Sequence, residues 1–236
     1  WGMTNRGDYV VNAATPADAR TAEDGLVAGN CGVNFTVNLS QPVEASDGGY
    51  DLGCAGTTPT AYSDVLVVRR ASARPAVLTA NRLQIQSNRV RARVISDGVL
   101  PAGFAAAPES ETYDLVVHAY YVSAMGVGAN GLAQWALRRK TLASPGGPAI
   151  QDVEIIRGIE DLQVQFGIDT NGDNGVDAYV DPEDPALATA TVIAVRLWLM
   201  AVSEDQEQGY LNDTNYVLAN QDHGRFDDGR RRVVAM

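Results

Sequence analysis

The sequence predicts a mainly β protein, an antiparallel sheet with long irregular loops. Several short segments alternate apolar and polar residues with a period of two, as half-buried strands do. Gly, Pro and Asn separate these segments, and the chain contains 23 Gly and 10 Pro among 236 residues. One or two short stretches have a helical pattern, and we find no internal repeat or heptad pattern. We therefore expect one domain over residues 1–236, with a loop-rich region at 1–60 and a β-sheet region at 61–236.

Composition narrows the kind of partner. Hydrophobic residues make up 45% of the chain and charged residues 20%, which is ordinary for a globular domain. The net charge of −11 argues against nucleic acid or an anionic membrane as the main partner, because binding phosphates needs a positive field. We find no apolar run of the roughly 18 residues that a membrane span needs. The chain begins at Trp1 rather than at Met, which predicts a fragment or a processed product.

The two cysteines lie in the loop-rich region. A short strand is expected in this region, at 33–39. Cys31 and Cys54 are surrounded in the sequence by Gly, Asn and Asp. We predict a disulfide between them, which would stabilise the fold by roughly 3 kcal/mol in the entropic model and would imply an oxidising compartment. The alternative is two reduced, partly buried cysteines. The spacing fits neither a CxxC redox pair nor a four-ligand zinc site.

Regular strands are predicted from residue 64 onward. Residues 64–70 are short and β-branched, and residues 83–94 alternate apolar and polar positions. A loop of small residues at 96–110 contains two prolines. Residues 113–123 are partly apolar on both faces, which predicts a central strand. Residues 133–142 lie between Gly-rich loops, so we expect them to form a hairpin with 113–123.

The strand around which the rest is organised is predicted after Gly158. Leu162, Val164, Phe166 and Ile168 alternate with polar residues or glycine, which predicts a half-buried strand. The later elements are expected as a return strand at 191–202, a long polar surface loop at 203–229 and a last strand at 230–235.

An acidic loop follows this strand. Oxygen-bearing side chains recur at Asp169, Asn171, Asp173 and Asp177, and Asp181 follows four residues later. Calcium takes six to eight oxygen ligands, and a D-x-N-x-D run brings three into one small loop. The spacing has one residue more before its glycine than the EF-hand pattern has. The sequence therefore offers two interpretations, a calcium site or a tight hairpin loop whose Asn-Gly pairs tolerate positive φ.

The sequence offers few candidates for catalysis. It contains two histidines, His118 and His223, and no HExxH, GxSxG or Walker motif. We interpret His118 as a structural residue of its strand and predict that the protein is not an enzyme, with no catalytic residue assigned. Three short basic runs, at 69–70, 138–140 and 230–232, are predicted to lie on solvated faces, with a binding ridge as the alternative.

Three segments resemble the PilW family of type IV pilus minor pilins. Residues 157–173, RGIEDLQVQFGIDTNGD, resemble the family's "GIE-LQV-YG-DTDGD" signature. Residues 192–200 are similar to its "V-AVRLWL" segment, and the opening Trp1-Gly2 is similar to the end of its "AGYWG" stretch. The resemblance covers mainly residues 150–236. The cleavage motif, the apolar N-terminal helix and its usual glutamate are absent, and the family often continues with a further strand after "RRRV".

The resemblance implies a pilin-like head, α+β when the missing N-terminal helix is counted. The implied role is structural: a minor pilin that helps prime pilus assembly, sits at or near the tip, and contacts other minor pilins and a tip adhesin. The full protein would be anchored by its helix in the inner membrane, with the head in the periplasm, before it joins the surface pilus.

Two other classes remain open. A secreted calcium-binding adhesion or carbohydrate-binding module would share the β content and the acidic loop. A secreted hydrolase with paired carboxylates would need two facing acids in a deep pocket, and the sequence offers no such pair.

Overall fold

The computed structural model describes residues 42–48, 57, 59–88, 92–128, 131, 133–143, 149–203, 205, 209–210, 212–225 and 231–236. The predictions of a strand at 33–39 and of a disulfide between Cys31 and Cys54 lie outside these residues. Within them the structure is mostly antiparallel β, as predicted, with one short 3-10 turn, η1 (Pro185–Ala188). No helix in the described ranges is long and apolar enough to cross a membrane.

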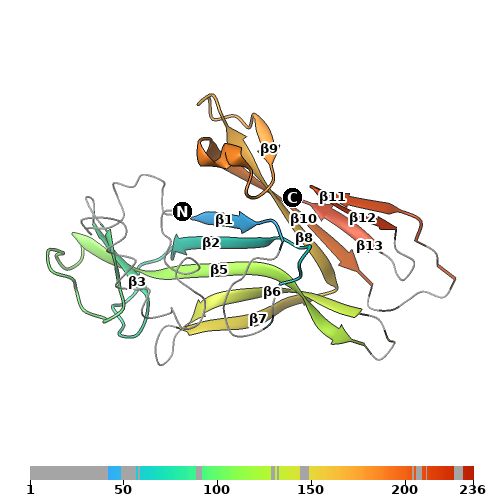
Figure 1. The fold of residues 1–236 in the computed structure, drawn as a ribbon. Helices are drawn as coiled ribbons and strands as arrows, with labels where there is room; N and C mark the ends of the chain where they lie inside the picture. Colours follow the sequence, from blue (N-terminus) through green and yellow to red (C-terminus); the bar gives the residue numbers. More distant parts are fainter. Residues whose placement is uncertain are drawn as a thin grey trace.

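A seven-stranded sheet, called sheet 1 below, forms the larger layer (Figure 1). Its strands are β1 (Val43–Ser46), β2 (Val65–Ala71), β3 (Gln84–Asn88), β4 (Ala92–Ile95), β5 (Ser110–Val127), β6 (Ala133–Ala143) and β7 (Ala149–Arg157). β5 is the central strand and pairs antiparallel with β2, β3 and β6. The predicted central strand and its hairpin with residues 133–142 are confirmed.

A four-stranded sheet, called sheet 2, crosses sheet 1 near one end (Figure 1). It consists of β8 (Ile159–Asp169), β9 (Ala178–Val180), β10 (Thr191–Val202) and β13 (Arg231–Ala235), in the order β13-β10-β8-β9. β10 returns antiparallel to β8, and β13 adds to the other side of β10. The return strand and the last strand are therefore confirmed. The two-stranded hairpin of β11 (Asn215–Leu218) and β12 (Gln221–Arg225) lies beside sheet 2.

β8, one of the two inner strands of sheet 2, is covered on both faces. Leu162, Val164 and Phe166 on one face of β8 pack against sheet 1. On the other face, Met200 of the paired strand β10 packs with Tyr216 and Leu218 of the β11–β12 hairpin. The prediction of a half-buried β8 was therefore wrong. The polar residues that alternate along β8 suggested a face exposed to solvent. That face is buried instead, because the β11–β12 hairpin and the segment before β2 form hydrogen bonds with β8.

Three other sequence expectations need correction. Residues 83–94 form the β3–β4 hairpin rather than one strand, with Gln84 opposite Ile95. Residues 149–157 form a strand of sheet 1, β7, where no strand had been expected. The expected long loop at 203–229 contains the β11–β12 hairpin. Its strands are short, so the alternation of Tyr216 and Leu218 was too brief to stand out against the polar residues around it.

The basic runs at 69–70 and 138–140 were predicted to lie on solvated faces, but each has one residue in the interior. Arg69 is fully buried, and its Nη2 donates to Glu44 Oε2 at 2.8 Å. Lys140 is 1% exposed, with its Nζ 5.5 Å from the centre of the Tyr121 ring. Both side chains alternate with less buried neighbours, because successive residues of a strand point to opposite faces. One residue of a basic run is therefore carried into the interior.

Candidate functional site

The chain passes from sheet 1 to sheet 2 at Gly158, the glycine of the "GIE" motif. Its φ of +73° is in the region that favours glycine. Its N–H donates to the carbonyl of Trp135 at 2.8 Å, and its own carbonyl accepts from the N–H of Val202 at 2.8 Å. A Cβ at this position would lie 2.9 Å from the Val202 carbonyl oxygen. Gly158 therefore joins β6 of one sheet to β10 of the other where no side chain fits.

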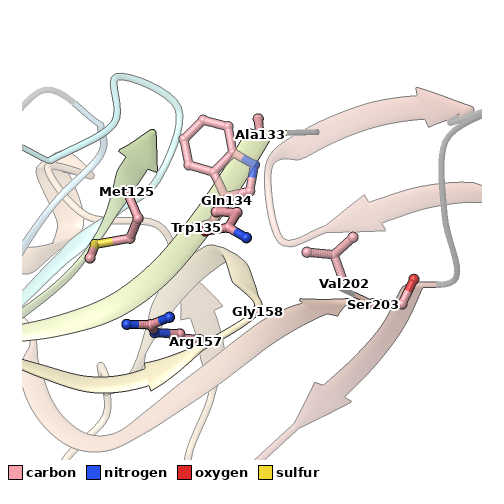
Figure 2. Close-up of a pocket in the computed structure, with 8 residues that line it drawn as sticks. All are labelled: Met125, Ala133, Gln134, Trp135, Arg157, Gly158, Val202 and Ser203. Carbon is pink, nitrogen blue, oxygen red and sulfur yellow. The ribbon is translucent and has the colours of Figure 1, made fainter. Parts of the chain in front are cut away.

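A pocket opens beside this junction (Figure 2). The end of β5 contributes Met125, and the start of β6 contributes Ala133, Gln134 and Trp135. The remaining lining residues are Arg157, Gly158, Val202 and Ser203. Met125 is 37% exposed at the rim. The pocket is a mainly nonpolar recess with Arg157 among its lining residues.

A buried polar contact holds the β11–β12 hairpin onto sheet 2. His223 Nε2 lies 2.7 Å from Asp161 Oδ2, and the Asp161 side chain has no exposed surface. Gln163 donates from Nε2 to Asp161 Oδ1 at 3.1 Å and to the carbonyl of Tyr62 at 2.9 Å. The Tyr62 ring meets the His223 ring edge to face, with the centres 5.7 Å apart. His223, expected in a polar loop, is thus an anchor of the hairpin.

A second buried carboxylate, Asp64, fixes β8 to the segment before β2. Asp64 is 1% exposed, and its Oδ2 accepts from the N–H of Val164 at 2.8 Å. The Ser63 hydroxyl accepts from the N–H of Leu162 at 3.0 Å. Burial raises the pKa of Asp64 to about 7, and the nearby Asp47 and Asp161 add to the rise. The hydrogen bonds from Val164 and Gly48 act in the opposite direction.

A third carboxylate, Asp152, joins the strands of sheet 1. Its Oδ2 accepts from the Tyr121 hydroxyl at 2.7 Å and from the Thr57 N–H at 2.9 Å, and its Oδ1 accepts from Arg138 Nε at 2.9 Å. Burial alone would raise the pKa of Asp152, but these hydrogen bonds outweigh it and lower the pKa. The three donors all stabilise the charged form of the Asp152 carboxylate.

The acidic loop closes on its own backbone. Asp169 accepts from the N–H groups of Asn171, Gly172 and Asn174 at 3.1, 2.6 and 2.9 Å. These amides lower the pKa of Asp169, the Gly172 amide most. Asn171 in turn donates from Nδ2 to Asp177 Oδ1 at 3.0 Å. Three of the five predicted calcium ligands, Asp169, Asn171 and Asp177, are thus linked by hydrogen bonds around one loop.

The other two predicted ligands point elsewhere. Asp173 Oδ1 accepts from the N–H of Gly175 at 2.7 Å, a local turn contact. Asp181 Oδ1 accepts from Gln165 Nε2 at 2.7 Å, beyond the loop. In the part of the chain that the structure describes, no three His, Cys, Asp or Glu side chains are grouped as a metal site would need. Calcium binding by this loop stays a prediction.

His118 has the environment of a strand residue. Its Nδ1 lies 3.2 Å from the Tyr120 hydroxyl. Burial lowers its pKa, and the positive charges of Arg139 and Arg70 lower it further.

Comparison with known proteins gives the class and the family. Residues 119–236 match the family model described as Type IV Pilus-assembly protein W, which defines a protein of type IV pilus assembly. The chain belongs to the PilW family. The matched region contains the junction at Gly158, all of sheet 2 and the acidic loop. No curated protein and no solved structure showed significant similarity to the chain.

Proposed function

We propose that this domain is the head of a minor pilin that helps prime type IV pilus assembly and sits at or near the pilus tip. In this role it binds other minor pilins and a tip adhesin through its surface. The full protein is held in the inner membrane by an N-terminal helix, with the head in the periplasm, until it enters the pilus. The protein acts as a structural subunit and not as an enzyme.

The observation that carries this proposal is the family match over residues 119–236. The motif that first suggested the family has a clear structural use in the head. Gly158 makes the turn between the sheets, Asp161 anchors the hairpin, and Leu162, Val164 and Phe166 form the interface between the sheets. The signature is therefore a scaffold motif, and it supports an assembly role rather than a catalytic one.

The buried carboxylates support the same role. Asp161 and Asp152 are engaged by His223 and by Tyr121 and Arg138. They hold together elements that are distant in sequence, as a structural subunit needs. A rigid head suits assembly, because partners recognise a surface that changes little on binding.

The test is complementation of a strain that lacks the gene. The full-length gene should restore surface pili and twitching motility, measured by shearing pili from cells and by spreading under agar. The tagged protein should co-purify with other minor pilins. A control variant at exposed Asp213 (D213N) should do the same. Normal piliation without the gene would refute the proposal, and sugar binding by the head without pilin binding would favour an adhesion module.

A further inference from the structure

Sheet 2 crosses one end of sheet 1 and leaves part of the same face open (Figure 1). Cross-strand partners share a face, so the strand register defines this surface. We call it the open face, and it consists of Val43, Arg70, Val116, His118, Arg139, Thr141, Gln151, Val153 and Ile156. The opposite face of sheet 1 is buried, with Val117, Ala119 and Tyr121 all at 0% exposure. The two faces of sheet 1 therefore differ in how far their side chains are exposed to solvent.

The open face is positively charged in an acidic protein. The chain has 29 acidic and 18 basic residues, yet the open face contains Arg70 and Arg139, and the acidic residue next along the same side of β5, Asp114, is paired with Arg82. Neither arginine forms a salt bridge with any residue that the structure describes. Arg70 Nη1 donates to the carbonyl of Ala71 at 3.1 Å. The acidic side chains of β7, Asp152 and Glu154, pair with Arg138 on the other face.

Arg139 carries the strongest sign of a missing partner. Its Nε is buried and has no hydrogen-bond partner among the described residues. Buried polar atoms in folded proteins nearly always have a partner, and each exception calls for an explanation. The charges of Arg139 and Arg70 both act on His118, which places the three groups near one another. The strand register places the two arginines on β2 and β6, on either side of His118.

Apolar side chains surround the two arginines. Val43 and Val153 are each 37% exposed, and Ile156 is 52% exposed. A free inorganic anion or a polar polyanion would gain nothing from these side chains. A protein segment with an apolar surface and a carboxylate would cover them and give the arginines charge-assisted, bidentate hydrogen bonds.

We propose that the open face docks an apolar segment of another pilus subunit, with an Asp or Glu side chain bound between Arg70 and Arg139. This inference deepens the proposed function and rests on it, because it identifies the surface through which the head meets its neighbour. Charge complementarity fixes the orientation of the segment, and the exposed valines and Ile156 contribute the apolar contact.

The test uses the full-length protein in cells that assemble pili. A photocrosslinker replaces Val153 (Val153→p-benzoylphenylalanine), and a second strain carries it at Val217, which is 60% exposed on the hairpin. Crosslinked products are identified by mass spectrometry. The Val153 position should capture another pilus subunit through a peptide that contains Asp or Glu. The Val217 position should not capture that peptide.

Charge variants separate the arginines from the general effect of charge. R70Q/R139Q should reduce the Val153 crosslink at least tenfold, whereas R74Q/R93Q, which removes the same charge at two exposed arginines, should leave it within twofold. Melting of purified heads checks that both variants fold. Equal crosslinking in both variants, a crosslink within the same chain or to a second copy, or no crosslink would overturn the inference. Loss of pili on deleting the gene would still support the proposed function in each of these cases.

Discussion

Asp64 makes the stability of the head depend on pH in a direction opposite to that of most carboxylates. Its pKa rises from 3.8 to about 7 in the folded protein because the carboxyl is buried between the sheets. Between these two values the folded chain keeps a proton that the unfolded chain has lost. Stability is therefore highest at low pH, as far as this group is concerned, and is lost as pH rises through the window from 3.8 to about 7.

The size of the effect follows from the shift. A rise of roughly 3 pH units, at about 1.36 kcal/mol per unit, corresponds to about 4 kcal/mol of stability lost by pH 8. D64N removes the ionisation while its side-chain oxygen still accepts the N–H of Val164. The variant should match the wild type near pH 4 and exceed it by up to about 4 kcal/mol at pH 8.

Urea unfolding followed by circular dichroism at pH 4.5, 6 and 8.5, at constant ionic strength, measures the difference. Other groups titrate in the same range, so the quantity of interest is the free energy of unfolding of D64N minus that of the wild type. D213N, at an exposed aspartate, serves as the control for the loss of one carboxylate. A difference for D64N that is the same at all three pH values would refute the reasoning.

Three further predictions concern the junction, the hairpin and the acidic loop. G172A should lower the free energy of unfolding by about 1–2 kcal/mol, because Gly172 has a positive φ. G158A should lower it more, because its Cβ would also meet a carbonyl oxygen of β10. Equal losses for the two variants in chemical denaturation would contradict the close contact at Gly158. H223F keeps a ring but leaves Asp161 Oδ2 without its histidine partner. It should lower the free energy of unfolding by about 1–3 kcal/mol and speed amide exchange in the β11–β12 hairpin. Unchanged exchange would show that His223 does not anchor the hairpin. Calcium, as a ligand of the folded state, should raise the melting temperature of the wild type and not that of D169N, and a melt that is the same in calcium and in chelator would leave the loop as a hairpin.

The class of the fold and most of its strands could be predicted from the amino-acid sequence alone. The alternation in residues 113–123 and 191–202 predicted the central strand of sheet 1 and the return strand of sheet 2, because period-two patterns survive in any sheet with a buried face. The "GIE" segment also indicated the family that the match over residues 119–236 then showed. These features are local, so they can be read without knowing which elements meet.

Tertiary structure decided which faces are covered and which charges are paired. Nothing local marks Asp161 as fully buried or His223 as its partner, since 62 residues separate them. The basic run at 138–140 shows the same limit. Lys140 turns into the interior, while Arg139 remains on the open face with a buried Nε that lacks a partner among the described residues. Strand alternation assigns such neighbours to opposite faces, but the packing of sheet 2 over one end alone decides which part of a face stays open.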